Sequence, residues 1–116
     1  MTRRDPAYRL HGRVWIDGPE GTFLGFGRVV LLERIGEHGS ISAAARSMNM
    51  SYRHAWDLVD SMNRQAKSPL IVSTTGGKGG GGARLTAEGK KAIAVFRAAW
   101  EDFKAFEARR SRDLDL

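Results

Sequence analysis

The amino-acid sequence predicts an α+β domain that is mainly α-helical, and three observations carry this prediction. A stretch with the composition of a strand near the N-terminus is followed by apolar residues at helical spacing. Two of the helical stretches are joined by only three residues, 49–51. A glycine run at 76–82 joins two short apolar stretches before a long terminal helix. A short helix, a tight turn, a second helix and a β-hairpin in this order form the winged helix-turn-helix pattern.

The composition restricts the class of protein. At 116 residues with 41% hydrophobic content, the chain has the size and composition of one globular domain. It contains no cysteine, which excludes disulfides, thiolate metal sites and cysteine nucleophiles. The charged N-terminus is not followed by an apolar run, so we expect no signal peptide, no membrane segment and a cytoplasmic location. A formal net charge of +6 and an isoelectric point near 10.3 favour a polyanionic partner.

The first part of the chain is predicted to form a β-hairpin and one helix. Residues 8–16 are expected to form a strand, and residues 17–21 contain the Asp, Gly and Pro of a turn. A short second strand is expected around 22–24. A helix should begin near Gly27 and end at Gly39, because glycine is the usual residue just past a helix C-terminus.

The two central helices are predicted from their caps and spacing. Ser42 is expected to cap a short alanine-rich helix from Ala43 to about Met48. After the turn at 49–51, Ser51 is expected to cap a longer helix over 52–66. The apolar residues of this second helix fall on one side, which should face the core: Ala55, Leu58, Val59, Met62 and Ala66.

The last part of the chain is predicted to form the wing and the terminal helix. Strands are expected at 70–72 and 83–85, on either side of the glycine run. Thr86 should cap a long helix that ends near Glu107, with a frayed polar tail after it. We therefore divide the chain into an N-terminal tail and hairpin at 1–26, a winged helix-turn-helix domain at 27–86 and a dimerisation helix with its tail at 87–116.

The N-terminal turn of the second central helix is the candidate for reading DNA bases. In a helix-turn-helix this turn enters the major groove. Arg53 can donate two hydrogen bonds to guanine O6 and N7, worth about 1–3 kcal/mol of discrimination. Two interpretations of Trp56 stay open, namely core packing at the elbow and a DNA contact. The predicted DNA-binding residues are Ser42, Ser51, Tyr52, Arg53, His54, Trp56, Asp57, Arg64, Lys67, Lys78 and Arg84.

The glycine run does not fit a nucleotide-binding loop. In the signature Gly-x-x-x-x-Gly-Lys-Ser/Thr, Val72 stands where the first glycine belongs and Gly79 follows Lys78. A wing whose Lys78 and Arg84 reach phosphates or the minor groove fits better. The alternative is a hairpin tip that contacts nothing.

The terminal helix carries an apolar stripe at alternating spacings of four and three residues. This stripe is wider than a terminal helix of one small domain needs, and it favours a two-fold subunit interface and a homodimer. Packing on the chain's own core is the alternative. The predicted interface residues are Ala92, Phe96, Ala99, Trp100, Phe103 and Phe106.

The sequence offers no catalytic or metal-binding group. Asp57 and Asp60 share the charged face of one helix, with no histidine placed between them. His11, His38 and His54 lack the spacing of metal ligands. We therefore expect neither an enzyme nor a cofactor.

Several of these segments together resemble a known family. The segments are 39–45 (GSISAAA), 50–57 (MSYRHAWD), 62–63 (MN) and 76–86 (GGKGGGGARLT). They are similar to the N-terminal DNA-binding domain of the ModE family of bacterial molybdate-responsive regulators, whose winged helix is similar to that of LysR-type regulators. The resemblance covers about 27–106 and implies a dimeric DNA-binding domain. It also implies DNA contacts by Tyr52, Arg53 and the wing around Lys78.

The resemblance also raises the question of the effector. Members of the family bind molybdate through additional C-terminal domains, and this sequence ends at Leu116. We therefore expect no tight molybdate site in this chain. Three alternatives stay open: no effector, an effector bound by a separate partner, and constitutive regulation of molybdenum-related genes.

The sequence therefore favours a DNA-binding transcriptional regulator that acts as a homodimer on an inverted repeat of duplex DNA. A winged helix that serves as a protein-interaction adaptor is the second hypothesis. Arg53, Arg64, Lys67 and a lysine in the wing favour DNA over the adaptor. A nucleotide-binding enzyme built on the glycine run is a distant third.

Overall fold

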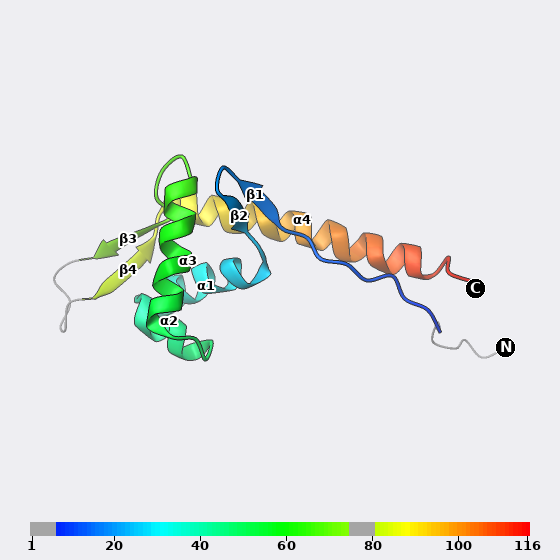
Figure 1. Cartoon of the computed structure of the whole chain (residues 1–116), viewed down its shortest axis with the longest axis horizontal. Coiled ribbons are helices and arrows are strands. Elements are labelled where there is room, and N and C mark those ends of the chain that lie inside the picture. The colour runs from blue at the N-terminus through cyan, green and yellow to red at the C-terminus, as the bar shows by residue number, and fades with distance from the viewer. Residues whose placement is uncertain (1–6, 75–80) are drawn as a thin grey trace.

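A computed structural model describes residues 7–74 and 81–116 of the chain. Its elements, in chain order, are β1 (Ile16–Gly18), β2 (Gly21–Leu24), α1 (Phe26–His38), α2 (Ile41–Ser47), α3 (Tyr52–Gln65), β3 (Ile71–Thr74), β4 (Gly82–Leu85) and α4 (Ala87–Ser111). Figure 1 shows these elements as an N-terminal hairpin, the helices α1, α2 and α3, a wing hairpin and the long terminal helix α4. The predicted mainly helical α+β fold is therefore confirmed.

The core is built around α1. This helix contacts α2, α3, α4 and β4. Its Leu31, Leu32 and Ile35 are completely buried, because they project at helical spacing into the layers formed by those elements. Phe96 of α4 is also 0% exposed. Phe96 was predicted to lie at a subunit interface, and that prediction is wrong, since the chain's own core already covers the ring.

Both sheets are two-stranded antiparallel hairpins. In the first, β1 pairs with β2 and the register shifts between Ile16 and Asp17. In the second, β3 pairs with β4 from Ile71 opposite Leu85 to Thr74 opposite Gly82. The second hairpin is the predicted wing. Lys78, the lysine expected in it, lies outside the described residues.

Three of the predicted helix ends are confirmed. The Ser51 hydroxyl accepts the backbone N–H of His54, and the Thr86 hydroxyl accepts that of Gly89. Gly39 ends α1 with φ of 77°, a left-handed conformation that glycine adopts at little cost.

The predicted cap of α2 is wrong. The residue that caps this helix is Ser40, whose hydroxyl accepts the backbone N–H of Ala43 at 3.0 Å. The helix therefore begins at Ile41, two residues before the predicted start at Ala43. Ser42 lies in the first turn, and its hydroxyl accepts a hydrogen bond from the Arg46 guanidinium at 2.9 Å.

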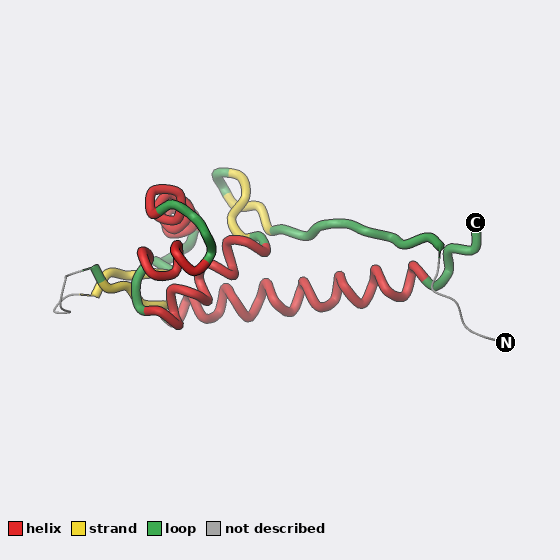
Figure 2. The backbone as a smooth tube through the Cα atoms, turned by 90° about the horizontal axis from the view of Figure 1, so that it is seen from below, coloured by secondary structure: helices red, strands yellow, loops and turns green. Residues whose placement is uncertain are grey.

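Residues 8–15, here called the strap, differ most from the prediction. A strand was expected over residues 8–16, but β1 begins only at Ile16, the last of them. The strap instead runs as an extended segment along the second half of α4 in both views (Figures 1 and 2). No strand of the described chain lies beside it, so α4 side chains bind its amides. Leu10 donates to the Ser111 hydroxyl and Gly12 donates to Glu107 Oε2, each at 2.8 Å.

These contacts also explain why α4 does not fray where expected. The helix was predicted to end near Glu107, but it continues to Ser111, where the strap is still attached. Gly12 lies so close to α4 that a Cβ at this position would stand 2.8 Å from the Phe103 ring. The strap and the end of α4 form an arm that extends the molecule to 64 Å along its longest axis.

Glu107 makes the attachment of the strap pH-dependent. Its carboxylate accepts Gly12 and lies 3.1 Å from the Lys104 ammonium, and both hydrogen bonds lower the pKa of Glu107, that of Lys104 most. Because the pKa of Glu107 is lower in the folded state, the ionised carboxylate stabilises the attached strap fully above the ordinary pKa of 4.5. This stabilisation is lost as the pH falls through the folded-state pKa. We expect the Gly12 amide resonance to move toward its detached position below that pH.

The NMR titration has a matched control. Glu107→Gln should show the detached Gly12 resonance already at neutral pH. The neutral glutamine side chain attracts the Lys104 ammonium and the Gly12 N–H less strongly than the charged carboxylate does. Glu101→Gln, an exposed change on the same helix, should leave the Gly12 titration unchanged. A Gly12 resonance that ignores both pH and Glu107→Gln would contradict this role.

Candidate nucleic-acid interface

The turn between α2 and α3 sets the direction of the candidate recognition helix. Asn49 has φ of 56°, which reverses the chain within three residues. The Met50 amide returns to the Ala45 carbonyl at 2.9 Å. Ser51 then caps α3 through the His54 amide at 3.1 Å. The first turn of α3 is therefore held from both sides and projects from the body.

Small side chains bring the two helices together. Ala44 and Ala45 of α2 and Ala55 of α3 are at most 1% exposed. Alanine allows helix backbones to approach closely. Val59 and Met62 continue the buried side of α3, which confirms the side predicted to face the core. The opposite side of α3 stays open to solvent.

The first turns of α3 present a cluster of exposed polar and aromatic groups. The Arg53 side chain is 81% exposed and its Nε lies 3.2 Å from Asp57 Oδ1. The guanidinium carbon lies 5.6 Å from the centre of the Trp56 ring. Tyr52 and Trp56 are 55% and 41% exposed. Trp56 is thus not a core residue, which removes one of its two interpretations.

In this arrangement Arg53 is held weakly enough to leave Asp57 for another hydrogen-bond acceptor. An exposed ion pair contributes only about 0–1 kcal/mol, so Asp57 holds the guanidinium without binding it tightly. The face of Trp56 favours the cation as well. A guanine in the major groove can therefore replace Asp57 as the partner of Arg53.

A groove runs between α3 and the wing. Residues of α3 line one side of it, and strand residues line the other: Tyr52, Trp56, Asp60, Asn63, Ser73, Thr74 and Gly82. Polar side chains face aromatic rings across the groove, as suits a surface that meets sugars, phosphates and base edges.

Asn63 fixes the wing to α3, a role that sequence analysis missed. Its Oδ1 accepts the Leu70 amide at 2.8 Å and its Nδ2 donates to the Ile71 carbonyl at 3.0 Å. The Asn63 side chain thus binds backbone groups at the start of β3, as a neighbouring strand would. The signal in the sequence was an asparagine near the end of a predicted helix, six residues before Pro69.

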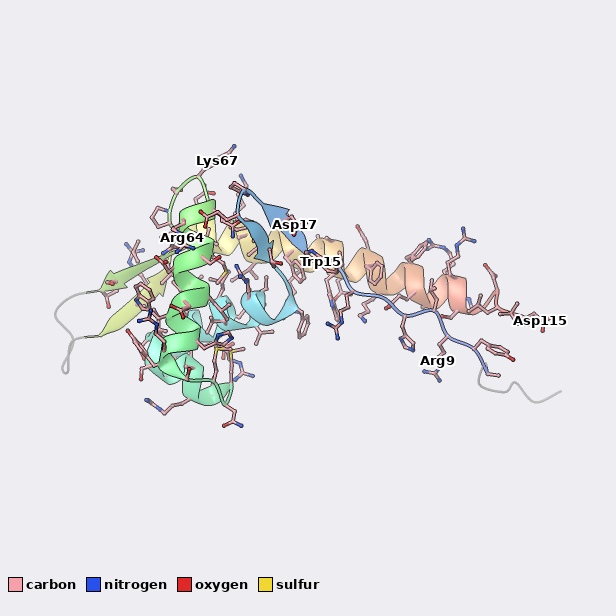
Figure 3. The ribbon with its side chains drawn as sticks, viewed as in Figure 1. Arg9, Trp15, Asp17, Arg64, Lys67 and Asp115 are labelled. Atoms are coloured by element: carbon pink, nitrogen blue, oxygen red, sulfur yellow. The ribbon has the colours of Figure 1, made fainter. Side chains whose placement is uncertain are left out.

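Not all predicted DNA-binding residues lie together. Ser51, Tyr52, Arg53, His54, Trp56 and Asp57 share the start of α3. Arg64 and Lys67 lie at the other end of α3, near the N-terminal hairpin (Figure 3). Arg64 pairs there with Asp60 and with Glu20, the latter at 3.1 Å.

The two remaining described residues lie on neighbouring elements. Ser42 is on α2, where it binds Arg46. Arg84 is exposed on β4 but lines a different groove, with Glu37 and Lys90. The structure therefore gathers the start of α3 into one surface and leaves Arg64, Lys67 and Arg84 apart from it.

The N-terminal hairpin clamps the end of α3, which sequence analysis also missed. Gln65 donates to the Thr22 carbonyl at 2.9 Å and accepts the Glu20 amide at 3.1 Å. Arg28 donates to the Ser61 hydroxyl at 3.1 Å, and partial burial lowers the pKa of Arg28. Helix α3 is thus fixed at both ends, at the turn and at the hairpin.

Two other kinds of site were sought in the described part of the chain. Among residues 7–74 and 81–116, no three His, Asp or Glu side chains gather as they would around a metal ion. None of the described helices is both long and apolar enough to span a bilayer.

Comparison with known proteins identifies the family. Residues 26–90 match the family described as "Bacterial regulatory helix-turn-helix protein, lysR family". The chain belongs to this family. The match includes α2, the turn, α3 and the wing, so this LysR-family chain carries a helix-turn-helix DNA-binding domain.

The curated relatives include ModE proteins, as the resemblance predicted. The chain is 39% identical to the molybdenum transport protein ModE of Azotobacter vinelandii over 109 residues, 94% of this chain and 40% of the relative. It is 50% identical to the molybdenum-pterin-binding protein MopB of Rhodobacter capsulatus over 78 residues, 67% of this chain and 29% of the relative. The DNA-binding transcriptional dual regulator ModE of Escherichia coli K12 is 44% identical over 69 residues, 60% of this chain and 26% of the relative.

These matches confirm the ModE-like character of the LysR-family domain. The chain corresponds to the N-terminal region of ModE. It spans well under half the length of the relatives it matches.

Proposed function

We propose that this chain regulates transcription by binding a specific operator as a homodimer. The exposed group of Tyr52, Arg53, Trp56 and Asp57 at the start of the second helix of the helix-turn-helix carries this proposal. These side chains occupy the part of the fold that enters the major groove. The lysR family match supports the same conclusion.

The outer side of α4 supports the homodimer. At 100° per residue, Val95, Ala99 and Phe106 share one stripe, roughly a third of a turn from the stripe of Glu107 and Ser111 that holds the strap. Val95 and Phe106 are 51% and 37% exposed, although both are apolar. The expected interface residues Ala92 and Phe103 are half-buried beside this stripe, whereas Trp100 is half-buried on the stripe of Glu107 and Ser111 and packs against the core. A second α4 would cover the stripe of Val95 and Phe106.

A two-fold axis through α4 would also determine the form of the operator. Each protomer would present one α3 to the major groove, and successive turns of DNA on one face are about 34 Å apart. The operator is therefore an inverted repeat. Because the relatives are named for molybdenum transport and molybdenum-pterin binding, we propose molybdenum-related genes as targets.

Salt-dependent binding to genomic DNA tests the proposal. We expect the purified protein to enrich a small set of fragments at about 50 mM salt, with the logarithm of affinity falling by about 0.9 for each phosphate contacted per decade of salt. Sequencing of the retained fragments should give an inverted repeat. Failure to retain any fragment at low salt would favour a protein-interaction adaptor instead.

A further inference from the structure

The arm carries a second surface, away from the start of α3. One groove between the strap and α4 is lined by Arg9, His11, Lys104 and Arg112, together with the Glu107 carboxylate that pairs with Lys104. A second is lined by Arg13, Trp15, Phe26, Trp100 and Lys104. The two grooves meet at Lys104, which lines both, so cationic and aromatic side chains follow one another along the arm.

The strap gives this surface an unused hydrogen-bonding edge. The amides of Leu10 and Gly12 point to α4 and are bound there. In an extended chain the intervening amides point the opposite way. Within the described residues, the backbone N–H groups of Arg9, His11 and Arg13 make no hydrogen bond. Such an edge is a template for one more extended strand.

The charge of this surface indicates which side chains the added strand should carry. Arg9 and Arg13 are exposed and form no ion pair within residues 7–74 and 81–116. Lys104 pairs with Glu107, which is the acid that already holds Gly12. The edge is therefore bordered by uncompensated positive charge, which complements acidic side chains.

The aromatic end adds an apolar requirement. Trp15 and Phe26 are 55% and 47% exposed, while the Phe26 ring lies 5.4 Å from that of Trp100. Exposed rings of this kind are enriched at the centres of protein interfaces. The occupant should therefore carry an apolar or aromatic side chain beside its acidic ones.

We infer that the arm binds an extended acidic segment of a partner protein, added as a strand along residues 9–13 with an apolar side chain placed beside Trp15. A nucleic acid fits less well, because a duplex offers no peptide groups to the free edge of the strap. Arg9 and Trp15 also lie along the arm rather than at the wing (Figure 3). This binding surface is independent of the DNA-binding role proposed above.

A fluorescent heptapeptide tests the inference, with aspartate at positions 1, 3 and 5, threonine at positions 2, 4 and 6 and tryptophan at position 7. In a strand its aspartates and its tryptophan share one face, as Arg9, Arg13 and Trp15 do on the strap. Anisotropy should show binding at low salt that weakens at about 0.5 M salt, where charges are screened beyond about 4 Å. A peptide with lysine in place of aspartate should not bind. Equal binding of the two peptides, or no binding of the acidic one, would overturn the inference.

Charge reversal locates the site. Arg9→Glu with Arg13→Glu should weaken the acidic peptide by about fivefold or more, since two exposed charge contacts become repulsive. Lys90→Glu with Lys91→Glu changes the net charge equally at the other end of α4 and should cost less than about twofold by screening. Trp15→Ala should weaken the peptide without any change of charge. An equal loss from both double variants would contradict the assigned site.

The experiment separates this inference from the proposed function. The Arg9→Glu, Arg13→Glu protein should bind duplex DNA as well as the Lys90→Glu, Lys91→Glu protein does. If duplex DNA displaces the peptide, the surface belongs to nucleic acid and the inference fails. If the protein binds the peptide but no DNA, the proposed function fails and the inference stands. Movement of the Gly12 amide resonance on peptide addition should report the same site.

Discussion

Replacing Arg53 by alanine is expected to lower affinity for the specific operator by about 5- to 150-fold, the equivalent of one lost bidentate guanine contact. Arg53 lies on the exposed start of α3, and only Asp57 and the Trp56 face hold it. Its removal leaves the core unchanged. Affinity for unrelated duplexes should fall much less, because phosphate contacts supply most non-specific binding. Titrations with operator and scrambled DNA measure both quantities.

Two lysine variants serve as controls for the Arg53→Ala experiment. Lys78→Ala, placed in the wing by the sequence, should weaken operator and scrambled DNA about equally, as a phosphate contact does. Lys67→Ala lies at the far end of α3 and should change the ratio of the two affinities least. If Arg53→Ala and Lys78→Ala change that ratio equally, Arg53 does not read bases.

The order of the elements could be predicted because each boundary carries a local signal. Ser51, Thr86 and Gly39 end or begin helices through contacts within a few residues, and all three predictions are confirmed. The cap of α2 is different, since Ser40 and Ser42 are both good caps by type. Ser40 follows the left-handed Gly39 directly and has the extended backbone of a cap, whereas Ser42 already lies inside the first turn of α2.

Partners distant in the sequence explain the other differences. The extended character of residues 8–15 was predicted, but whether a strand finds a neighbouring strand depends on the whole chain. Here the side chains of Glu107 and Ser111 accept the strap amides that a neighbouring strand would otherwise bind. Periodicity likewise put Phe96 on the apolar stripe of α4, but did not say which part of the stripe the core of its own chain covers.

The same distinction applies to the candidate site. The start of α3 was predicted from the fold, because the turn before it determines which residues project. Arg64 and Lys67 were added because they are basic and fall on the helix side opposite the apolar residues, without regard to their position along the helix. A helix of 14 residues is about 21 Å long, so its two ends cannot share one contact. Gln65 binds the N-terminal hairpin, 43 residues away at Thr22, which no local pattern reveals. Asn63 binds the start of β3 only seven and eight residues further on, but its role depends on how the chain turns back after α3.

Phe106→Glu is expected to separate the proposed homodimer and to reduce operator affinity by about 100-fold or more. Phe106 is 37% exposed on the outer stripe of α4, and its ring lies 6.3 Å from that of Phe103. A buried aromatic side chain contributes about 2–3 kcal/mol, and a carboxylate in its place must also be desolvated. Two linked half-sites gain about 10²- to 10⁴-fold over one, so the loss exceeds that of a single contact.

The choice of Phe106 over Phe103 follows from the strap. Phe103 lies against Gly12, so a charge there would detach the strap as well as any second copy. Ala105→Glu adds the same charge to an exposed position of α4 outside the stripe and should leave the dimer intact. Sedimentation of the three proteins at about micromolar concentration, a range in which a stable homodimer stays associated, decides the matter. A wild-type monomer would refute the homodimer, and a Phe106→Glu variant that stays dimeric would place the interface elsewhere than on α4.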